Sequence, residues 1–257
     1  MQELTFSYAW WQFLLLALGS YLLGSVNFAV IISKLKRKDI RTAGSGNPGT
    51  LNMSRTFGLG IGILTLVLDI VKGAIPALVG WYLYSDFTFK GSGLQVSMLT
   101  QVMCGFFAVL GHVFPIFMKF KGGKGIATTI GVFAVCNWKV ALVSGIVAII
   151  FILFTEIGSM GSFIATTPGA IWACYYVYTR YIAVASALSA KIMVASFTNL
   201  FIVLIIVLTW YAHRKNIQRL IAGEEHPTNW LQMIRETIIK KRLKKQQNQE
   251  ISEKEDK

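Results

Sequence analysis

Long apolar runs separated by short basic stretches constrain this sequence more than any other feature. The first run, residues 13–32, is almost unbroken by polar side chains. About 20 such residues, coiled into a helix, cross a hydrocarbon core of about 30 Å. Charged residues make up only 14% of the chain, whereas they make up about a quarter of a typical soluble domain. The sequence therefore predicts an all-α integral membrane protein.

Further apolar runs follow the first along the chain. They cover residues 57–84, 94–118, 126–154, 163–178 and 192–211. Asn137-Trp138-Lys139 interrupts the run 126–154, so we expect two short helices that meet near Asn137. With two short helices, the polar residues 155–162 lie on the same side of the membrane as the start of the first of them. The prediction is about seven transmembrane or partly spanning helices.

The basic residues between the runs indicate the orientation of the chain. Those between the first two runs, opposed only by Asp39, are Lys34, Lys36, Arg37, Lys38, Arg41 and Arg55. Cytoplasmic loops carry an excess of Lys and Arg, so this loop is predicted to be cytoplasmic and the N-terminus external. Residues 179–191 are predicted to form an external loop. The cluster that starts at His213-Arg214-Lys215 places the C-terminus in the cytoplasm.

The chain changes character after Glu225. Beyond this point apolar residues such as Trp230, Leu231 and Ile238 recur at helical spacing among many Lys and Arg. We expect two parts: a polytopic membrane domain, 1–225, and a basic, amphipathic and partly disordered cytoplasmic tail, 226–257. Anionic membrane lipids are the expected partner of the tail. A solvated helix that packs on another protein is the alternative.

The net charge of +13 restricts the choice of partners. A nucleic-acid-binding protein would gather its basic residues on one continuous face, whereas here they fall between apolar runs. Nucleic acid is therefore not an expected partner. Anionic lipid headgroups and phosphorylated substrates are expected instead.

A basic, glycine-rich turn separates two of the apolar runs. It reads Lys119-Phe120-Lys121-Gly122-Gly123-Lys124-Gly125. Glycines allow backbone N–H groups to converge on one point, and the lysines add charge, so the stretch suits a bound phosphate. A plain cytoplasmic turn whose lysines satisfy the positive-inside rule is the alternative.

Four polar stretches are predicted to share the cytoplasmic side. They are residues 44–55, the glycine-rich turn, residues 159–162, and residues 213–225. Together they supply hydroxyl groups, cations, one histidine and one carboxylate, an inventory that suits a ligand with two phosphate groups. Asp69 and Lys72 lie one helical turn apart inside a run, and we interpret them as a structural ion pair.

Metal and nucleophilic chemistry have no matching motif. His112, His213 and His226 lack the partner spacing of a metal site. The glycine-rich turn lacks the Gly-Lys-Ser/Thr ending of a Walker A loop, and no G-x-S-x-G elbow is present. We therefore expect neither a metal nor a cofactor.

The polar stretches, taken in order, resemble the bacterial acyl-phosphate-dependent glycerol-3-phosphate acyltransferases. The resemblance lies in Gly44-Ser45-Gly46-Asn47-x-Gly49-x-x-Asn52-x-x-Arg55, Leu68-Asp69-x-x-Lys72-Gly73, Gly111-His112-x-Phe114-Pro115, Phe120-Lys121-Gly122-Gly123-Lys124-Gly125, Ser159-x-Gly161-Ser162 and His213-Arg214-x-Asn216 through Gly223-x-Glu225. It covers residues from about 12 to 225, and the tail is an addition to the family pattern.

This resemblance implies transfer of a fatty acyl group from acyl phosphate to the 1-hydroxyl of glycerol 3-phosphate, in phospholipid biosynthesis. The products are lysophosphatidic acid and inorganic phosphate, and no covalent acyl-enzyme is expected. It also implies a multi-pass protein of the bacterial inner membrane. An enzyme that produces acyl phosphate is a possible further partner.

The resemblance also implies roles for individual residues. The catalytic set is Ser45, Arg55, His213 and Asn216. The substrate- and phosphate-binding set is Gly46, Asn47, Asn52, Lys121, Gly122, Gly123, Lys124, Gly125, Ser159 and Ser162. Glu225 joins Asp69 and Lys72 as a structural residue. Helix packing is the alternative role for Ser159 and Ser162.

A membrane transporter of an organic phosphate or other anion is the competing function. A transporter is expected to have broken helices near mid-membrane and an internal repeat. Here the polar residues gather at one predicted face, which favours the enzyme.

Overall fold

The computed structural model describes residues 2–90, 94–182, 188–225 and 227–255. Its α-helices are α1 (Phe6–Ser25), α2 (Phe28–Leu35), α3 (Thr50–Phe57), α4 (Leu59–Leu83), α5 (Val96–Val113), α6 (Ile126–Cys136), α7 (Trp138–Thr155), α8 (Gly158–Val177), α9 (Leu188–Ala212), α10 (Arg214–Ile221) and α11 (Trp230–Glu255). Shorter turns of helix are η1 (Ile40–Thr42), η2 (Ile116–Met118) and η3 (Tyr178–Ile182). Strands β1 (Gln2–Leu4) and β2 (Phe87–Phe89) pair in parallel.

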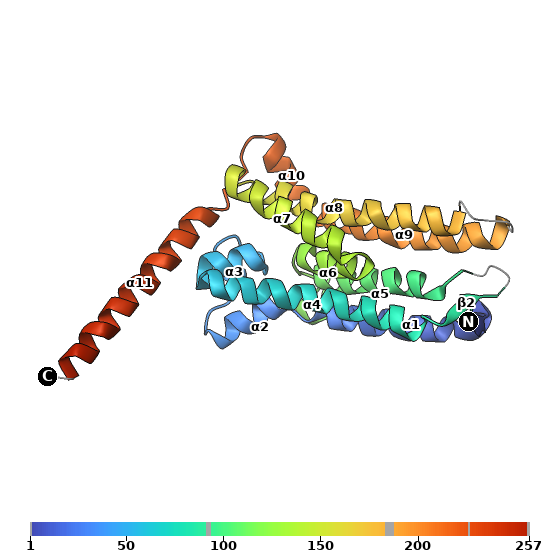
Figure 1. Ribbon diagram of the computed structural model, residues 1–257, viewed down its shortest axis with the longest axis horizontal. Helices are drawn as coiled ribbons and strands as arrows, with labels where there is room; N and C mark the ends of the chain where they lie inside the picture. The colour runs from blue at the N-terminus through green and yellow to red at the C-terminus, as the bar shows by residue number, and fades with distance from the viewer. Residues whose placement is uncertain (1, 91–93, 183–187, 226, 256–257) are drawn as a thin grey trace.

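The long helices form a bundle whose axes follow the long direction of the molecule (Figure 1). In the described residues, 5 segments are long and apolar enough to cross a membrane: Ala9–Leu35, Leu59–Leu83, Val96–Met118, Trp138–Thr155 and Ile192–Ala212. Helix α6 is shorter, and α8 carries Ser, Thr and Pro among its apolar residues. The prediction of an all-α integral membrane protein is confirmed.

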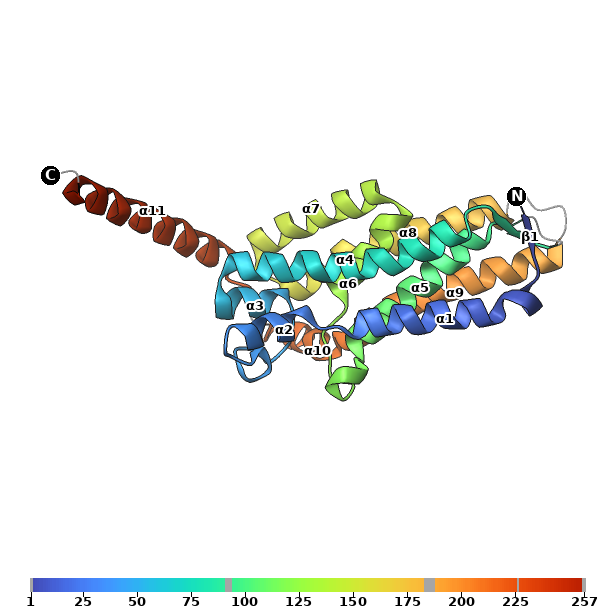
Figure 2. The same ribbon diagram turned by 90° about the horizontal axis from the view of Figure 1, so that it is seen from below.

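The first predicted span is not one continuous helix. The chain leaves helical geometry after Ser25 and begins α2 at Phe28. Asn27 is the N-cap of α2, and its side-chain oxygen accepts a 3.0 Å hydrogen bond from the N–H of Val30. An Asn side chain at this position pairs with one of the backbone N–H groups in the first turn of the helix, which would otherwise have no partner. The break turns α2 away from the bundle axis (Figure 2).

Two predictions about the middle of the chain have different outcomes. Helices α6 and α7 meet at Asn137, as predicted, and the Asn137 side chain caps α7 by accepting from Lys139 and Val140. Helix α8, however, begins at Gly158, five residues before the predicted start at 163. Because α7 ends in a left-handed turn at Glu156, the chain reverses within two residues. Ser159 and Ser162 therefore lie on the first turns of a helix and not in a loop.

Small residues bring the helices of the bundle close together. A side chain at Gly24 of α1 would collide with the backbone of Ala108 in α5, and one at Gly73 of α4 would collide with the backbone of Thr128 in α6. Such close contacts are typical of helix packing in membranes, where water does not drive helices together. The buried core includes Val102, Val109 and Phe133. Helix α5 is central to the bundle, since it packs on α1, α4 and α9.

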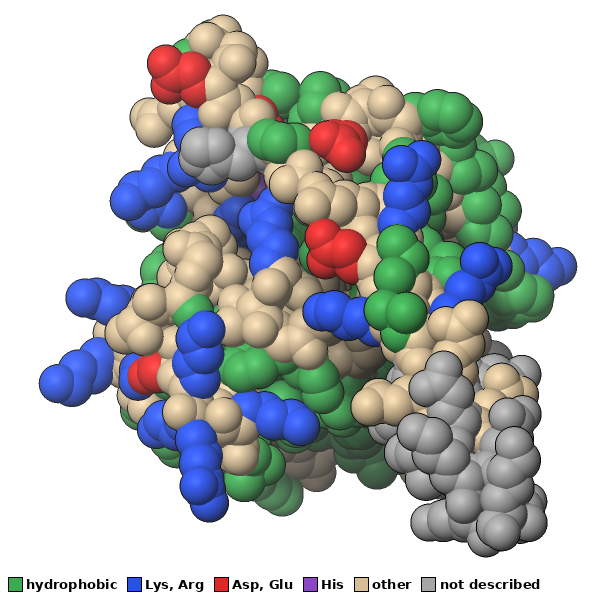
Figure 3. All heavy atoms as spheres, turned by 90° about the vertical axis from the view of Figure 1, so that its left-hand side faces the viewer, with side chains coloured by type: hydrophobic (Ala, Val, Ile, Leu, Met, Phe, Trp, Pro, Cys, Tyr) green, Lys and Arg blue, Asp and Glu red, His purple; other side chains and the backbone are tan. Residues whose placement is uncertain are grey.

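The two ends of the bundle differ in polarity. The N-terminus, β1 and β2 lie at one end, and α2, α3 and α10 lie toward the other (Figures 1 and 2). Lys and Arg side chains crowd the second end (Figure 3). We call it the basic end. Of the predicted external loop 179–191, residues 183–187 lie outside the described residues.

The C-terminal tail is more regular than predicted. Helix α11 starts at Trp230 and continues to Glu255, through most of the last dozen residues, the part of the tail that we expect to be disordered. It points away from the bundle at the basic end (Figure 1). Leu231, Ile238, Ile239 and Leu243 remain exposed along it.

Candidate active site

The glycine-rich turn is folded back onto the end of α5. Lys119 and Phe120 both have left-handed backbone angles, with φ of 51° and 58°. The N–H of Gly122 donates to the carbonyl of Val113 at 3.1 Å, and that of Gly123 donates to the carbonyl of His112 at 3.2 Å. These two N–H groups therefore hold the turn in place and do not converge on a ligand, contrary to the prediction. The turn instead leads into the start of α6, where the first N–H groups of a helix lack intrahelical partners and favour anions.

Lys124 is the residue of the turn that reaches a partner from another helix. Its Nζ donates to Oδ1 of Asn216 in α10 at 2.6 Å. The Nδ2 of Asn216 in turn donates to Oε1 of Glu225 at 3.0 Å, and Oε2 of Glu225 lies 3.7 Å from Nε of Arg219. Burial lowers the pKa of Lys124 to about 8. The structure thus joins three residues that were predicted from two separate stretches.

His213 lies buried beside this chain of contacts, with 2% of its surface exposed. Its Nδ1 is 2.9 Å from the carbonyl oxygen of Thr209, so Nδ1 carries the proton and Nε2 is the acceptor. Burial, together with the charge of Lys124, lowers the pKa of His213 to about 4. The ring is therefore neutral near pH 7 and accepts a hydrogen bond more readily than it takes up a proton.

The His112 ring packs against Gly123 of the glycine-rich turn, a role that the sequence did not indicate. It is 4% exposed, and a Cβ atom at Gly123 would lie only 3.1 Å and 3.2 Å from its Cε1 and Cδ2. Its Nδ1 lies 3.2 Å from the hydroxyl of Thr128 in α6 and 3.9 Å from Oδ1 of Asp69. The position of Gly111-His112 just before the turn was the one available signal.

Asp69 and Lys72 form the buried ion pair that their spacing predicts. The Nζ of Lys72 lies 2.8 Å from Oδ1 of Asp69 and donates to the carbonyl of Val26 at 2.9 Å. The pair thus connects α4 to the break between α1 and α2. Through the contact of Asp69 with His112 it also underlies the glycine-rich turn. This geometry agrees with the structural role that we assign to the pair.

The first motif forms a loop built around Asn52. The buried Asn52 side chain donates to the carbonyls of Ile40 at 3.2 Å and Ala43 at 2.9 Å, and it accepts from the N–H of Ser45 at 3.1 Å. Both amide hydrogens are thereby used, so Asn52 shapes the loop and does not offer the free donor predicted for phosphate. Ser45 remains exposed on this loop, and Gly46 and Asn47 are partly buried.

Two further predicted residues have free hydrogen-bonding capacity near the basic end. Arg55 is exposed, and its Nη2 donates to the carbonyl of Pro227 at 2.8 Å. Its charge contributes to the lowered pKa of Lys124, so the two cations act on one another electrostatically. Ser159 is buried, and within the described residues its hydroxyl has no hydrogen-bond partner. An unpaired buried hydroxyl is costly unless a ligand or water satisfies it.

Ser162, Lys121 and Gly125 complete the predicted set. The hydroxyl of Ser162 donates to the carbonyl of Gly158, one turn earlier in α8, at 2.9 Å, so its proton is used within its own helix. Lys121 is exposed. Gly125 is the N-cap of α6 with φ of 80°, a backbone angle that favours glycine.

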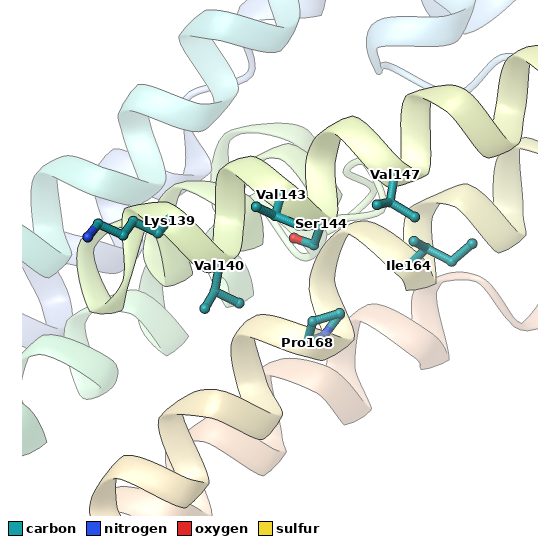
Figure 4. A pocket seen from close by; sticks show the side chains of 7 residues that line it. All are labelled: Lys139, Val140, Val143, Ser144, Val147, Ile164 and Pro168. Carbon is teal, nitrogen blue, oxygen red and sulfur yellow. The ribbon is translucent and has the colours of Figure 1, made fainter.

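An apolar groove of about 400 Å³ lies between α7 and α8. Its lining residues are Lys139, Val140, Val143, Ser144, Val147, Ile164 and Pro168 (Figure 4). The hydroxyl of Ser144 is already bonded to the carbonyls of Ala141 and Ala165. The groove is suited to an apolar chain, and none of the predicted site residues lines it.

Comparison with known proteins identifies the family to which this chain is similar. Residues 14–223 match the model of a family described as glycerol-3-phosphate acyltransferase. The chain is 39% identical over 216 residues to the glycerol-3-phosphate acyltransferase of Shouchella clausii, covering 81% of this chain and 92% of that protein. It is 37% identical over 221 residues to glycerol-3-phosphate acyltransferase 2 of Thermotoga maritima, covering 86% and 97%.

Solved structures give the same result. The crystal structure of PlsY (YgiH), an integral membrane glycerol 3-phosphate acyltransferase, in its glycerol 3-phosphate form superposes with a TM-score of 0.67 at 32% identity, covering 87% of this chain and 98% of that one. The lysophosphatidic acid form superposes with a TM-score of 0.64, again at 32% identity, covering 84% and 95%. The family match, the identities and the shared fold together show that this chain belongs to the glycerol-3-phosphate acyltransferase family.

Proposed function

We propose that this acyltransferase moves a fatty acyl group from acyl phosphate to the 1-hydroxyl of glycerol 3-phosphate, without a covalent acyl-enzyme. The observation that carries the proposal is the gathering of Lys124, Arg55, His213 and the unpaired Ser159 hydroxyl at the basic end. Both substrates carry a phosphate group, and cations with neutral donors are what two phosphates require.

The residues divide into phosphate binders and a hydroxyl acceptor. Arg55 supplies a planar guanidinium that contacts two phosphate oxygens at once, and Lys124 supplies a point charge held by Asn216. Ser45 and Ser159 supply neutral donors. Nδ1 of His213 donates to the carbonyl of Thr209, which leaves Nε2 as a hydrogen-bond acceptor. We assign Nε2 the role of orienting the attacking hydroxyl.

An acyl phosphate is already an activated mixed anhydride. The hydroxyl oxygen attacks the carbonyl carbon, the bond from that carbon to the phosphate oxygen breaks, and inorganic phosphate leaves with the electron pair. An oxygen of the departing phosphate takes the hydroxyl proton, because His213 with a pKa of about 4 is a weak base. Alignment of the two substrates alone is worth about 7–11 kcal/mol.

A covalent route would need a nucleophile paired with a base. Among the described residues, the hydroxyl bonded to a histidine is that of Thr128, on Nδ1 of His112. Asp69 approaches the same ring nitrogen, whereas a catalytic relay uses both nitrogens of the ring, one for the nucleophile and one for the acid. The contact therefore favours a supporting role for His112.

The test uses purified protein, palmitoyl phosphate and labelled glycerol 3-phosphate. Formation of labelled lysophosphatidic acid with release of one phosphate per ester supports the proposal. Incubation with labelled palmitoyl phosphate alone, followed by denaturation, should leave no label on the protein. A stable protein-bound acyl group would refute the direct mechanism, and uptake into vesicles without ester formation would favour the transport alternative.

We further propose that the protein is a multi-pass protein of the bacterial inner membrane with its basic end in the cytoplasm. The concentration of Lys and Arg at that end supports this orientation (Figure 3). The tail is proposed to contact anionic lipids, because α11 exposes apolar residues beside Arg235, Lys240 and Arg242. A soluble enzyme that supplies acyl phosphate would then reach the site from the cytoplasm.

A further inference from the structure

The chain beyond the family match returns to the candidate active site. The match ends at residue 223, yet Pro227 and Thr228 lie between α3 and the turn that joins α7 to α8. The carbonyl of Pro227 accepts the 2.8 Å hydrogen bond from Nη2 of Arg55. The N–H of Thr228 donates to the carbonyl of Glu156 at 3.0 Å. We call these two residues the clamp.

The Thr228 side chain of the clamp is buried in the protein. Thr228 is 1% exposed, and its Cγ2 would lie 2.8 Å from a Cβ atom at Gly158, the first residue of α8. The side chain of Leu51, from α3, would lie 3.2 Å from the same atom. Thr228 and Leu51 thus both lie against the start of α8.

A described residue on each side of the clamp is anchored as well. Glu225 is bonded to Asn216 on the N-terminal side. On the C-terminal side Asn229 accepts a 3.0 Å hydrogen bond from the N–H of Met233 and so opens α11. The clamp is therefore a short link between two fixed points, and its carbonyl faces Arg55 as a consequence of the fold.

The hydrogen bond from Nη2 to the Pro227 carbonyl restricts the motion of the Arg55 side chain and still leaves N–H donors for a phosphate. The arginine side chain is exposed and flexible, so an unrestrained guanidinium loses substantial rotamer freedom when it binds phosphate. The guanidinium has five N–H donors, and one bond to a neutral oxygen leaves the remaining donors for a charged ligand. Phosphate is a stronger acceptor than the carbonyl because the bond to it is charge-assisted.

We propose that the clamp is a positioning element for Arg55: the tail of this chain reaches back and holds the guanidinium ready for a substrate phosphate. Pro227 and Thr228 are positioning residues, since they act through Arg55. The inference rests on the proposed function, in which Arg55 binds phosphate.

The first experiment compares two full-length variants at one position. Thr228→Pro removes the N–H that Glu156 accepts, whereas Thr228→Val keeps that N–H and nearly the same shape, and the Thr228 hydroxyl has no partner to lose within the described residues. We expect Thr228→Pro to raise the KM for glycerol 3-phosphate or palmitoyl phosphate about five- to thirtyfold, with a much smaller change in kcat. Thr228→Val should match the wild type.

The second experiment keeps the clamp in place. A Gly158→Cys, Thr228→Cys double variant places two thiols close together, because Cγ2 of Thr228 would lie 2.8 Å from a Cβ atom at Gly158. If the clamp positions Arg55 during turnover, the oxidised variant keeps the activity of its reduced form. Loss of activity on oxidation, recovered by reductant, would show that the segment must leave the site and would overturn the proposal.

The outcomes separate this inference from the function on which it rests. An inactive wild type would refute the proposed function. An active wild type with an equally active Thr228→Pro variant would refute the clamp alone, and a more active variant would make the segment inhibitory. If Thr228→Pro fails to fold, loss of activity in the oxidised disulfide variant would still overturn the proposal.

Discussion

Gly123→Ala tests whether the contact between the glycine-rich turn and His112 sets the affinity for a phosphate substrate. The new methyl group would press on the His112 ring, with Cε1 and Cδ2 at 3.1 Å and 3.2 Å. The ring cannot swing aside easily, because it is buried and Thr128 contacts Nδ1. The turn must therefore move, and with it the adjacent Lys124.

The magnitude follows from the cost of overpacking. Inserting a methyl group into a well-packed site costs about 1–3 kcal/mol, which corresponds to about a 5- to 150-fold change in an equilibrium constant. We assign this cost to substrate binding, so the KM for glycerol 3-phosphate should rise by that factor. The kcat should change less than the KM, because the strain falls on the turn, which reaches Asn216 through Lys124 and, within the described residues, has no hydrogen bond to His213.

The assay is steady-state kinetics with glycerol 3-phosphate varied at saturating palmitoyl phosphate. Gly60→Ala is the matched control, since a Cβ at this helical position meets nothing within 4 Å. Combining His112→Ala with Gly123→Ala should restore part of the lost affinity, because the smaller side chain makes room. An unchanged KM in Gly123→Ala, or a lower melting temperature with no change in KM, would refute the reasoning.

Three further outcomes are expected. Arg55→Ala should abolish transfer while the melting temperature stays within a few degrees, because the exposed Arg55 side chain loses one hydrogen bond; near-normal turnover would remove Arg55 from the site. Because the pKa of Lys124 is about 8, its positive charge is lost as pH rises through that value, so kcat/KM should fall above about pH 8, and Lys124→Arg should abolish this alkaline decline even if its activity is lower. Asn52→Ala should destabilise the protein by about 1–3 kcal/mol, measured by thermal unfolding, because the carbonyls of Ile40 and Ala43 each lose one of two hydrogen bonds and the N–H of Ser45 loses its acceptor; an unchanged melting temperature would contradict its loop-supporting role.

Local patterns were sufficient to locate most of the membrane helices. Apolar runs of about 20 residues identify membrane helices because length and hydropathy are properties of consecutive residues. The meeting of α6 and α7 at Asn137 was also predictable, since a side chain that caps a helix acts on its own N–H groups. Lys124, Asn216 and Glu225 were all identified before their contacts were known.

Other roles could not be predicted because they depend on contacts between distant segments. The N–H groups of Gly122 and Gly123 were expected to bind phosphate, and only the packing of the turn on α5 shows that they bond to backbone carbonyls. Asn52 was expected to bind phosphate and instead holds its own loop. The carbonyl of Pro227 on Arg55 joins residues 172 positions apart.

The sequence by itself determined that this chain is an all-α membrane protein and which polar stretches we propose for the site, because hydrophobic length, charge and glycine-rich motifs are encoded in neighbouring residues. Only the tertiary structure decided which donors in those stretches remain free. Hydrogen-bonding groups are satisfied wherever packing brings a partner, so a free donor can be distinguished from one already in use only when all neighbouring segments are in place.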